Sequence, residues 1–353
     1  MHNCRKLTSF RGRAMVSQIK RKADLVTLAQ TQDLNRPALG IMFVLVGMFA
    51  MSINDMLIKQ LSGGYPLHQI VFTRSVFGIL FSLAMVQAEG GLRILRTRNP
   101  WLHATRGLLI VTSNMAYFTA LAVLPLANTA ALFFVAPLMI TLLSIPFLGE
   151  KVGPFRIGAV VVGFVGVLIM LQPWQGENDF GVSWIVMILP IIAALTYALN
   201  QILTRKLGAT TKASALVIYI QATFIIVSIG FWVFAGDGRF AVGLESESLI
   251  FLLRAWVWPA DSDLLLFGGL GMISSVIGYA LSQAYRVTDA ATVAPFEYVG
   301  LPLAVFWGWL FWAELPDFIA TIGIALIMAS GLFVFLREKT RARPVTKPVN
   351  RKY

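Results

Sequence analysis

Charge is scarce in this chain, and cysteine and histidine are scarcer still. Asp, Glu, Lys and Arg make up 13% of the 353 residues, whereas soluble domains carry about 25%. The single cysteine is Cys4, and the three histidines, His2, His68 and His103, lie too far apart in sequence to indicate a metal site. No nucleophile–base arrangement and no phosphate-cradling loop occurs either. The sequence therefore predicts no disulfide, metal, cofactor or catalytic residue, and the chain is not expected to be an enzyme.

Apolar residues, by contrast, make up 57% of the chain and fall into long continuous runs. A helix needs roughly 20 apolar residues to cross a bilayer, and these runs are too continuous for the alternating strands of a barrel. The composition predicts an all-α polytopic membrane protein with the lipid bilayer as its main surroundings. The ten predicted spans are residues 38–58, 68–88, 105–122, 127–147, 155–173, 182–203, 213–235, 264–285, 290–312 and 317–337.

The net charge of +12 does not indicate nucleic-acid binding, because the positive residues are concentrated on one side of the predicted spans, as in membrane proteins. Most of the 29 Lys and Arg residues lie in the tails 1–36 and 338–353 and in alternate loops, including Arg106 before the third span. The opposite loops hold only Arg239 and Arg254. This bias predicts that both basic tails are cytoplasmic. Residues 1–36 lack the apolar core of a signal peptide, and Met15 is an alternative start.

Two stretches of equal length, 120–150 and 284–314, align without a gap at an offset of 164 residues. Each contains a polar hinge, a start rich in small residues, a proline and a final glutamate, Glu150 or Glu314. An earlier match aligns Asn54 and Lys59 with Asn200 and Arg205. Such internal duplication is typical of transporters built from two related halves.

The duplication predicts two repeats, 38–173 and 182–337, each with five spans. Because five is odd, the second repeat would insert upside down relative to the first, and a solute cavity would lie near the midplane. Pro137 and Pro302 occupy matching positions and are either hinges for rocking or simple kinks. Glu150 and Glu314 are expected to order turns near helix N-termini. The glycines at 158, 163 and 166 are expected to allow close helix packing.

With its paired domains, its LGE and WAE sequences at 148–150 and 312–314, and its glycine-containing final helices, the chain resembles the ten-helix drug/metabolite transporter superfamily, in particular its members with two EamA domains. The sequences SIND at 52–55 and DAAT at 289–292, together with APFEY at 294–298, look like bacterial members described as S-adenosylmethionine or riboflavin uptake carriers. Other members of the superfamily export amino acids and their metabolites. The resemblance implies transport of a small molecule without fixing which one.

Charged side chains within membrane spans are costly, so each one is a candidate for the solute site. Asp55 could bind solute, exchange a proton, or pair with Lys59 one helical turn away. Arg74 could bind a solute anion or pair with Asp55. Glu297 follows Pro295, which frees a backbone carbonyl and opens the helix, so it is the strongest proton-coupling candidate. A buried hydrogen bond to a neighbouring helix is the alternative.

Neutral polar residues complete the predicted solute site. Superfamily resemblance implies that such residues on the third, fourth, eighth and ninth helices line the cavity, although each alone could make only an interhelical hydrogen bond of about 0.6 kcal/mol. The predicted set is Asn54, Asn114, Tyr117, Tyr197, Asn200, Tyr279, Gln283 and Tyr298, with the charged candidates Asp55, Arg74 and Glu297.

The longest loop, 236–262, contains an apolar segment at 249–258 that is too short to span and is either a surface anchor or a lid. The chain as a whole is expected to be a secondary transporter of the bacterial inner membrane that works by alternating access, coupled to protons or to exchange. The alternatives are an exporter of amino acids, a lipid-acting membrane enzyme, and an assembly or sensor protein. Import or export, the coupling ion and the formation of a homodimer remain open.

Overall fold

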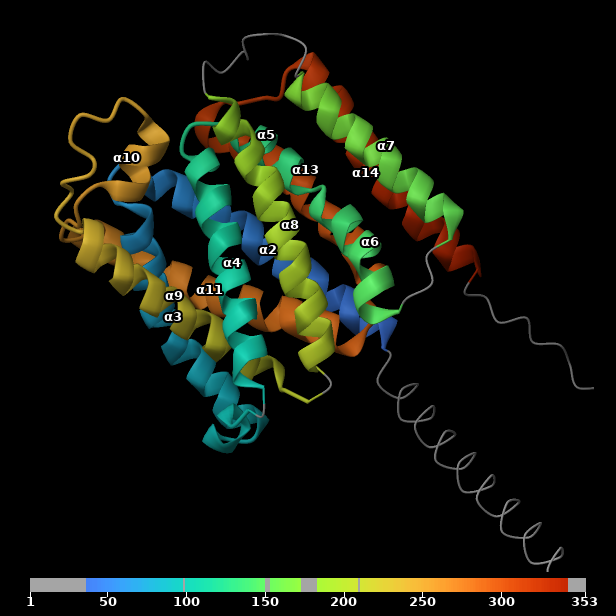
Figure 1. Ribbon diagram of the computed structural model, residues 1–353, viewed down its shortest axis with the longest axis horizontal. Coiled ribbons are helices and arrows are strands. Elements are labelled where there is room, and N and C mark those ends of the chain that lie inside the picture. Colours follow the sequence, from blue (N-terminus) through green and yellow to red (C-terminus); the bar gives the residue numbers. More distant parts are fainter. Residues whose placement is uncertain (1–35, 98, 150–152, 173–182, 209, 342–353) are drawn as a thin grey trace, which may run out of the picture.

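A computed structural model describes residues 36–97, 99–149, 153–172, 183–208 and 210–341. Within these ranges the chain forms helices and no strand. The elements, labelled as in Figure 1, are α2 (Pro37–Leu61), α3 (Leu67–Glu89), η1 (Leu92–Leu95), α4 (Pro100–Leu121), α5 (Leu126–Phe133), α6 (Ala136–Leu148), α7 (Pro154–Leu171), α8 (Trp184–Gly208), α9 (Ala213–Ala235), α10 (Glu247–Leu253), α11 (Asp261–Val287), α12 (Ala290–Val293), η2 (Ala294–Val299), α13 (Gly300–Trp312) and α14 (Phe318–Arg341).

The all-helical prediction is confirmed for the described residues, and each predicted span overlaps one helix or one broken helix. The predicted start of the third span is too late. Its helix, α4, begins at Pro100, where the fixed φ of proline suits the first helical turn. Arg106 therefore lies inside α4, and its interpretation as a loop cation is wrong.

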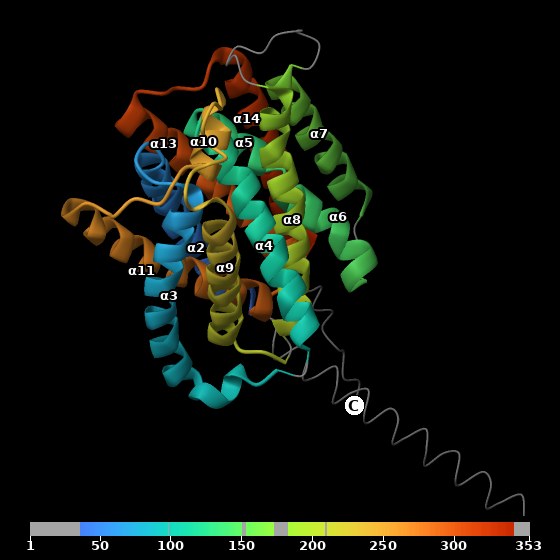
Figure 2. The ribbon, with the colours of Figure 1, turned by 60° about the vertical axis from the view of Figure 1, so that its left-hand side comes forward.

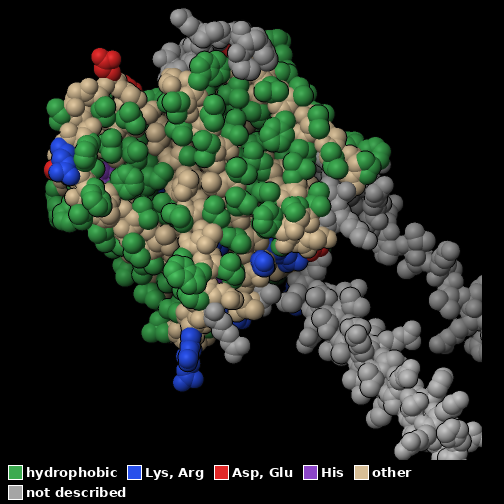
Figure 3. All heavy atoms as spheres, viewed as in Figure 1, with side chains coloured by type: hydrophobic (Ala, Val, Ile, Leu, Met, Phe, Trp, Pro, Cys, Tyr) green, Lys and Arg blue, Asp and Glu red, His purple; other side chains and the backbone are tan. Residues whose placement is uncertain are grey.

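Six helical stretches of the described chain are long and apolar enough to cross a bilayer. They are Pro37–Leu61, Leu67–Glu89, Leu126–Leu148, Trp184–Gly208, Ala213–Ala235 and Asp261–Val287. Shorter apolar helices occur at Ile157–Leu171 and Phe318–Phe333. Hydrophobic side chains cover the middle of the face in Figure 3, while Lys and Arg lie at its margins. This surface suits lipid rather than water.

The fourth and ninth predicted spans are both broken near their middle. Between α5 and α6, the N–H of Phe134 bonds to the carbonyls of Ala130 and Ala131, and Pro137 follows in the first turn of α6. Proline has no N–H and its ring would clash with a continuing helix, so the helix restarts there. In the ninth span the break is the 3₁₀ helix η2, which begins with Ala294 and Pro295, and Pro302 lies within the first turn of α13.

Helices from the two halves of the chain pack against each other in pairs. The pairs are α2 with α11, α3 with α9, α4 with α8, α7 with α14, and the broken helix α5–α6 with η2 and α13. Figures 1 and 2 show α7 and α14 side by side at one edge of the bundle. The start of α2 and the end of α14 both lie toward the lower right of Figure 1. We call the end of the bundle that carries α10 the α10 end, and the opposite one the η1 end.

Glycines account for the tight contact between α7 and α14. A Cβ added to Gly166 would lie 2.9 Å from the carbonyl oxygen of Gly323, and one added to Gly323 would lie 2.8 Å from that of Gly166. A Cβ added to Gly163 would overlap the side chain of Leu138 on α6. Gly158 has open space around it, so the expectation that it permits close packing is wrong.

The short helix α10 occupies the loop predicted to hold an anchor or a lid. The backbone carbonyls of Leu252 and Val257 meet the side chains of His68 and Gln69, and Arg254 donates to the carbonyl of Gly63, 2.7 Å away. These bonds tie the loop to the start of α3, while Trp258 is 91% exposed. Glu150 and nearly all of both basic tails lie outside the described residues.

Candidate functional site

Side chains from seven helices, six of which contribute polar groups, meet around one cavity of about 100 Å³ in the middle of the bundle. The helices are α2, α3, α4, α5, α8, α9 and α11, so both halves of the chain contribute. Seven of the predicted site residues line the cavity: Asn54, Asp55, Arg74, Asn114, Tyr117, Tyr197 and Asn200. Five aromatic rings belong to the same wall: Tyr117, Phe118, Phe133, Tyr197 and Phe224. We call this space the chamber.

Asn54 stands between the two charged residues on the α2–α3 side of the chamber. Its Oδ1 accepts a hydrogen bond from Arg74 Nη1 at 3.1 Å, and its Nδ2 donates to Asp55 Oδ1 at 3.1 Å. Asp55 also accepts from the hydroxyl of Tyr117 at 3.2 Å. The predicted direct pairs of Asp55 with Lys59 and with Arg74 do not form; an amide and a phenol hold the carboxylate instead.

Arg106 lines the chamber at its η1 end and is completely buried. Its Nε donates to Thr204 Oγ1 at 2.6 Å, Nη1 to the carbonyl of Leu216 at 2.9 Å, and Nη2 to Ser282 Oγ at 3.1 Å. The residue thus joins α4 to α8, α9 and α11. Sequence reasoning missed it because a boundary set a few residues late placed it in a loop.

Several polar atoms on the chamber wall lack a hydrogen-bond partner. They are Arg74 Nε, Asn200 Oδ1 and Gln221 Oε1, all on residues that are at most 4% exposed. Leaving a buried polar atom unpaired costs about 1–3 kcal/mol, so these atoms are ready to receive water or solute. Asn54 and Asn200, which the internal repeat aligns, both face this space.

Glu297 lies one layer behind the chamber rather than on its wall. Its Oε1 accepts from the hydroxyl of Tyr285 at 2.6 Å and from that of Tyr197 at 3.1 Å. The carboxylate is 1% exposed. Tyr197 therefore connects Glu297 to the chamber, since its ring lines the wall and its hydroxyl reaches the acid.

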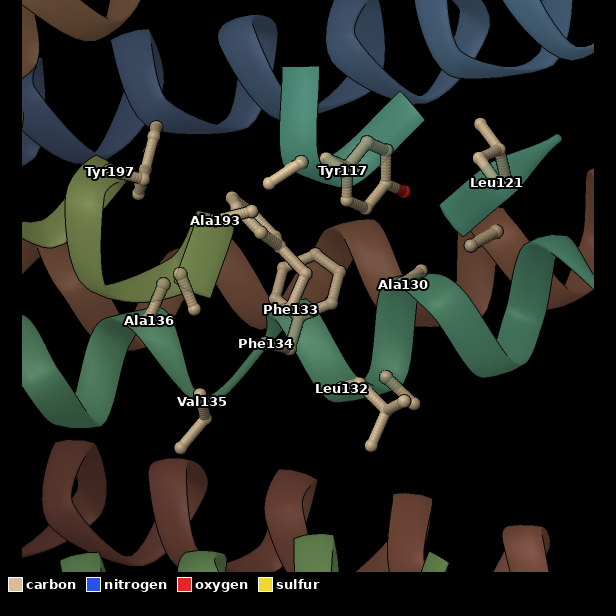
Figure 4. Packing of buried hydrophobic residues seen from close by; sticks show 14 of the residues in the cluster. Tyr117, Leu121, Ala130, Leu132, Phe133, Phe134, Val135, Ala136, Ala193 and Tyr197 are labelled. Atoms are coloured by element: carbon tan, nitrogen blue, oxygen red, sulfur yellow. The ribbon is translucent and has the colours of Figure 1, made fainter. Parts of the chain in front are cut away.

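A second, smaller cavity adjoins the chamber near α5 and α13. Asp55, Tyr117 and Phe133 line both spaces. The ring of Phe133 lies 5.1 Å from that of Tyr117 and 5.2 Å from that of Tyr197, and Figure 4 shows it beside the kink between α5 and α6. Movement at the kink would displace the ring of Phe133, which lies between the chamber and the smaller cavity.

Besides Glu297, three predicted site residues do not line the chamber. Tyr279 donates to Glu89 Oε1 at 2.9 Å, and Gln283 accepts from Arg286 at 3.2 Å. The ring of Tyr298 packs against Gly331, where an added Cβ would overlap it, and lies 6.1 Å from the ring of Phe134. Tyr279 and Gln283 lie on α11, which lines the chamber with other residues, and Tyr298 lies on η2, which does not line it. The described residues hold no cluster of three metal-ligating side chains.

One ion pair lies at each end of the bundle, and their basic partners, Lys59 and Arg205, are residues that the internal repeat aligns. At the α10 end, Lys59 at the end of α2 pairs with Glu314, 2.6 Å away, and Glu314 also accepts from the N–H of Leu126. At the η1 end, Arg205 near the end of α8 pairs with Asp289, 2.7 Å away, just before α12. Glu314 does serve a helix N-terminus, that of α5.

Comparison with known proteins places this chamber in a family. Residues 38–172 match the model of the EamA-like transporter family. The riboflavin transporter of Rhizobium johnstonii is 31% identical over 311 residues, which cover 88% of this chain and 95% of that protein. The S-adenosylmethionine uptake transporter of Rickettsia prowazekii is 26% identical, covering 85% and 93%. The pseudopaline exporter of Pseudomonas aeruginosa is 28% identical, covering 82% and 94%.

A solved crystal structure shares the fold, with a TM-score of 0.63 at 18% sequence identity, covering 86% of this chain and 98% of that one. The relatives are transporters rather than enzymes, and they match this chain over nearly their whole length. Together with its apolar helices, this match makes the protein a multi-pass bacterial membrane transporter. The chain belongs to the EamA-like transporter family of the drug/metabolite transporter superfamily.

Proposed function

We propose that this protein is a secondary transporter of the bacterial inner membrane that carries a small polar metabolite through the chamber by alternating access. The observation that carries the proposal is the chamber itself. Both halves of the chain line it with buried polar groups, three of which have unpartnered atoms. Polar groups inside a membrane bundle are costly unless they serve transport or another function.

The helix pairs support ten spans arranged as two inverted repeats. If α2–α7 and α8–α14 are related by a two-fold axis in the membrane plane, α2 corresponds to α8 and α4 to α11. The contact of α2 with α11 then maps onto the contact of α8 with α4, and both contacts are present. The pairs α3–α9 and α7–α14 map onto themselves. Such symmetry lets one scaffold open toward either face.

The two ion pairs supply matched closures for this motion. Lys59 and Arg205 occupy equivalent places in the two repeats, and their pairs lie at opposite ends of the bundle. Opening at one end would separate the nearer pair while the other holds. The chamber is also smaller than the 300–1,000 Å³ typical of ligand sites, so solute entry requires the helices to part, with Pro137 and Pro302 as the proposed hinges.

Asp55 and Glu297 are the proposed proton-coupling residues. Asp55 touches the chamber directly, and Glu297 reaches it through the hydroxyl of Tyr197. Both carboxylates are held only by neutral donors among the described residues. Among the described residues neither carboxylate is locked in a direct ion pair, since Asn54 stands between Asp55 and Arg74, so each can gain and lose a proton at smaller cost than a directly paired one.

In the proposed orientation the η1 end, where α2 begins, faces the cytoplasm, because the tails are basic and positive charge favours the cytoplasmic side. Uptake of a vitamin-like or nucleoside-like solute agrees with the names of two relatives, a riboflavin transporter and an S-adenosylmethionine uptake transporter. Export of amino acids or their metabolites agrees with the exporter among them. A homodimer is compatible with either direction.

Counterflow in proteoliposomes tests the proposal. Vesicles loaded with unlabelled riboflavin, S-adenosylmethionine or an amino-acid mixture should accumulate the matching labelled solute against an empty-vesicle control. Proton coupling is supported if a pH gradient drives solute exchange in the wild type and in the exposed control Asp237→Asn. The same gradient should have no effect in Glu297→Gln or Asp55→Asn. Lipid turnover without any solute flux would instead favour a membrane enzyme and would overturn the transport proposal.

A further inference from the structure

The charges that face the chamber do not balance. Two guanidinium groups, Arg74 and Arg106, line it, but only one carboxylate, Asp55, does so. Glu297 lies behind Tyr197 and is engaged by two phenols. The wall of the chamber therefore carries one positive charge in excess when all three groups are ionised.

Arg106 is the source of the excess. All three of its hydrogen-bond acceptors are neutral oxygens, on Thr204, Leu216 and Ser282. Among the described residues, no carboxylate lies within 4 Å of it. A guanidinium has five N–H donors, so these three bonds leave two donors on its terminal nitrogens. A completely buried, uncompensated cation costs several kcal/mol in a membrane protein, and a bound anion would offset that cost.

Arg74, by contrast, is balanced. Asn54 links it to Asp55, and Nη2 donates to Asn114 at 2.5 Å. Its guanidinium also lies 5.8 Å from the ring of Phe118 and 5.2 Å from that of Phe224. Only Nε lacks a partner. Arg74 can therefore donate one hydrogen bond, from Nε, to a solute whose charged group binds at another residue.

The geometry of α4 separates the two cationic positions. Arg106 and Asn114, which binds Arg74, are eight residues apart on one face of the helix, which corresponds to about 12 Å at 1.5 Å per residue. The rings of Phe118 and Phe224 lie beside the guanidinium of Arg74. Tyr117, which bonds to Asp55, lies beside the ring of Phe133. A solute that fits has an acidic group at one end and a ring or flat apolar body at the other.

We propose that the chamber selects organic anions: solutes with net negative charge at neutral pH, whose carboxylate or phosphate binds Arg106 and whose ring-bearing body packs against the aromatic wall. This inference rests on the proposed transport function. It makes Arg106 the residue that determines charge specificity, through the planar fork with which arginine binds oxyanions.

The first test uses the wild-type protein and works with a solute that has not been identified. Proteoliposomes and empty liposomes are loaded with a low-molecular-weight extract of bacterial cytosol, and the solutes that leave over time are identified by mass spectrometry. Solutes released faster from proteoliposomes should be organic anions at pH 7. Release of neutral or cationic solutes alone would overturn the anion proposal and leave transport intact. No protein-dependent release at all would count against transport itself, and the present inference would fall with it.

The second test isolates Arg106. Riboflavin and riboflavin 5′-phosphate share one ring system and differ in a phosphate, so they form a matched pair of competitors for the release of the identified anions. The phosphate should compete at least tenfold more strongly in the wild type and in Arg96→Gln, which removes an exposed cation near the same end. Arg106→Gln should abolish that preference, and Arg106→Lys should retain part of it.

Equal competition by the two flavins in the wild type would overturn the assignment. So would an unchanged preference in Arg106→Gln accompanied only by a lower melting temperature, which would make Arg106 a purely structural clamp between α4, α8, α9 and α11. If Arg106→Gln does not fold, the wild-type comparison and Arg106→Lys still decide between these outcomes.

Discussion

Lys59 and Glu314 are 255 residues apart in sequence, yet Lys59 Nζ lies 2.6 Å from Glu314 Oε2 at the α10 end of the bundle. The side chain of Lys59 is 10% exposed and that of Glu314 is 29% exposed. The ammonium also lies 4.9 Å from the ring of Trp312. One contact thus fastens the end of α2 to the end of α13 and the start of α5.

Breaking this pair should favour opening at the α10 end. We expect Lys59→Gln to raise the labelling rate of a cysteine placed at Ala130, near the smaller cavity, by roughly fivefold, because an ion pair with partial exposure contributes about 1 kcal/mol at most. The measurement is maleimide labelling from the α10 side in a background where Cys4 is replaced. The charge-reversed pair Lys59→Glu with Glu314→Lys should restore the slow rate. Equal labelling in all three proteins would contradict a closing role.

The pair at the other end should act in the opposite sense. Arg205→Gln removes both the ion pair with Asp289 and the bond from Nη1 to the carbonyl of Arg286. We expect it to increase labelling of a cysteine at Ser282 from the η1 side and to decrease labelling at Ala130 from the α10 side. Lys206→Gln, an adjacent exposed cation, is the control. If both positions became more reactive, the two ends would not be coupled.

The α7–α14 contact should be sensitive to a single methyl group. Gly166→Ala and Gly323→Ala each place a Cβ against a backbone carbonyl that cannot turn away, so we expect each to lower the melting temperature by several degrees, which corresponds to about 1–3 kcal/mol of overpacking. Gly158→Ala lies on the same helix with open space around it and should be neutral or slightly stabilising. Thermal unfolding in detergent measures all three. Similar values would show that the contact is loose.

Substitution of Tyr117 and of Tyr279 should have different effects on transport and on stability. Tyr117→Phe removes a hydroxyl that holds Asp55 beside the chamber, and we expect it to alter the pH dependence and the apparent affinity of transport. Tyr279→Phe removes a hydroxyl bonded to Glu89, away from the chamber, and should cost about 1 kcal/mol of stability with little change in affinity. Counterflow at several pH values, compared with thermal unfolding, distinguishes them. A larger transport defect in Tyr279→Phe than in Tyr117→Phe would show that Tyr279 belongs to the solute site.

The positions of most helices were predictable, because a long apolar run ends where polar residues begin. The run at 213–235 coincides with α9, residue for residue. Limits were harder to place where an interfacial aromatic preceded the run: Trp101, 83% exposed, and Arg106 both fall within α4, which begins earlier than its apolar part. That single shift concealed the most distinctive cation of the chamber.

Faces and partners were harder to predict than spans. In helices that are apolar nearly all round, periodicity does not reveal which side meets the core, so Tyr279 and Gln283 were assigned to a wall that α11 presents with Ser274, Gly278 and Ser282 instead. The partner of Lys59, Glu314, could not be found by local spacing, because it follows α13, far away in the sequence. Asp55, one turn away, was the nearer acid in sequence but not in space.

The reciprocal approach of Gly166 and Gly323 has a practical consequence. Because each glycine leaves room for the backbone of the other, a mutation at either position perturbs the same contact between α7 and α14. A revertant screen that starts from a damaged Gly166 should recover compensating changes on α14, and one that starts from Gly323 should recover them on α7. The outermost pair of helices can therefore be mapped by suppressor genetics alone, whatever the cargo.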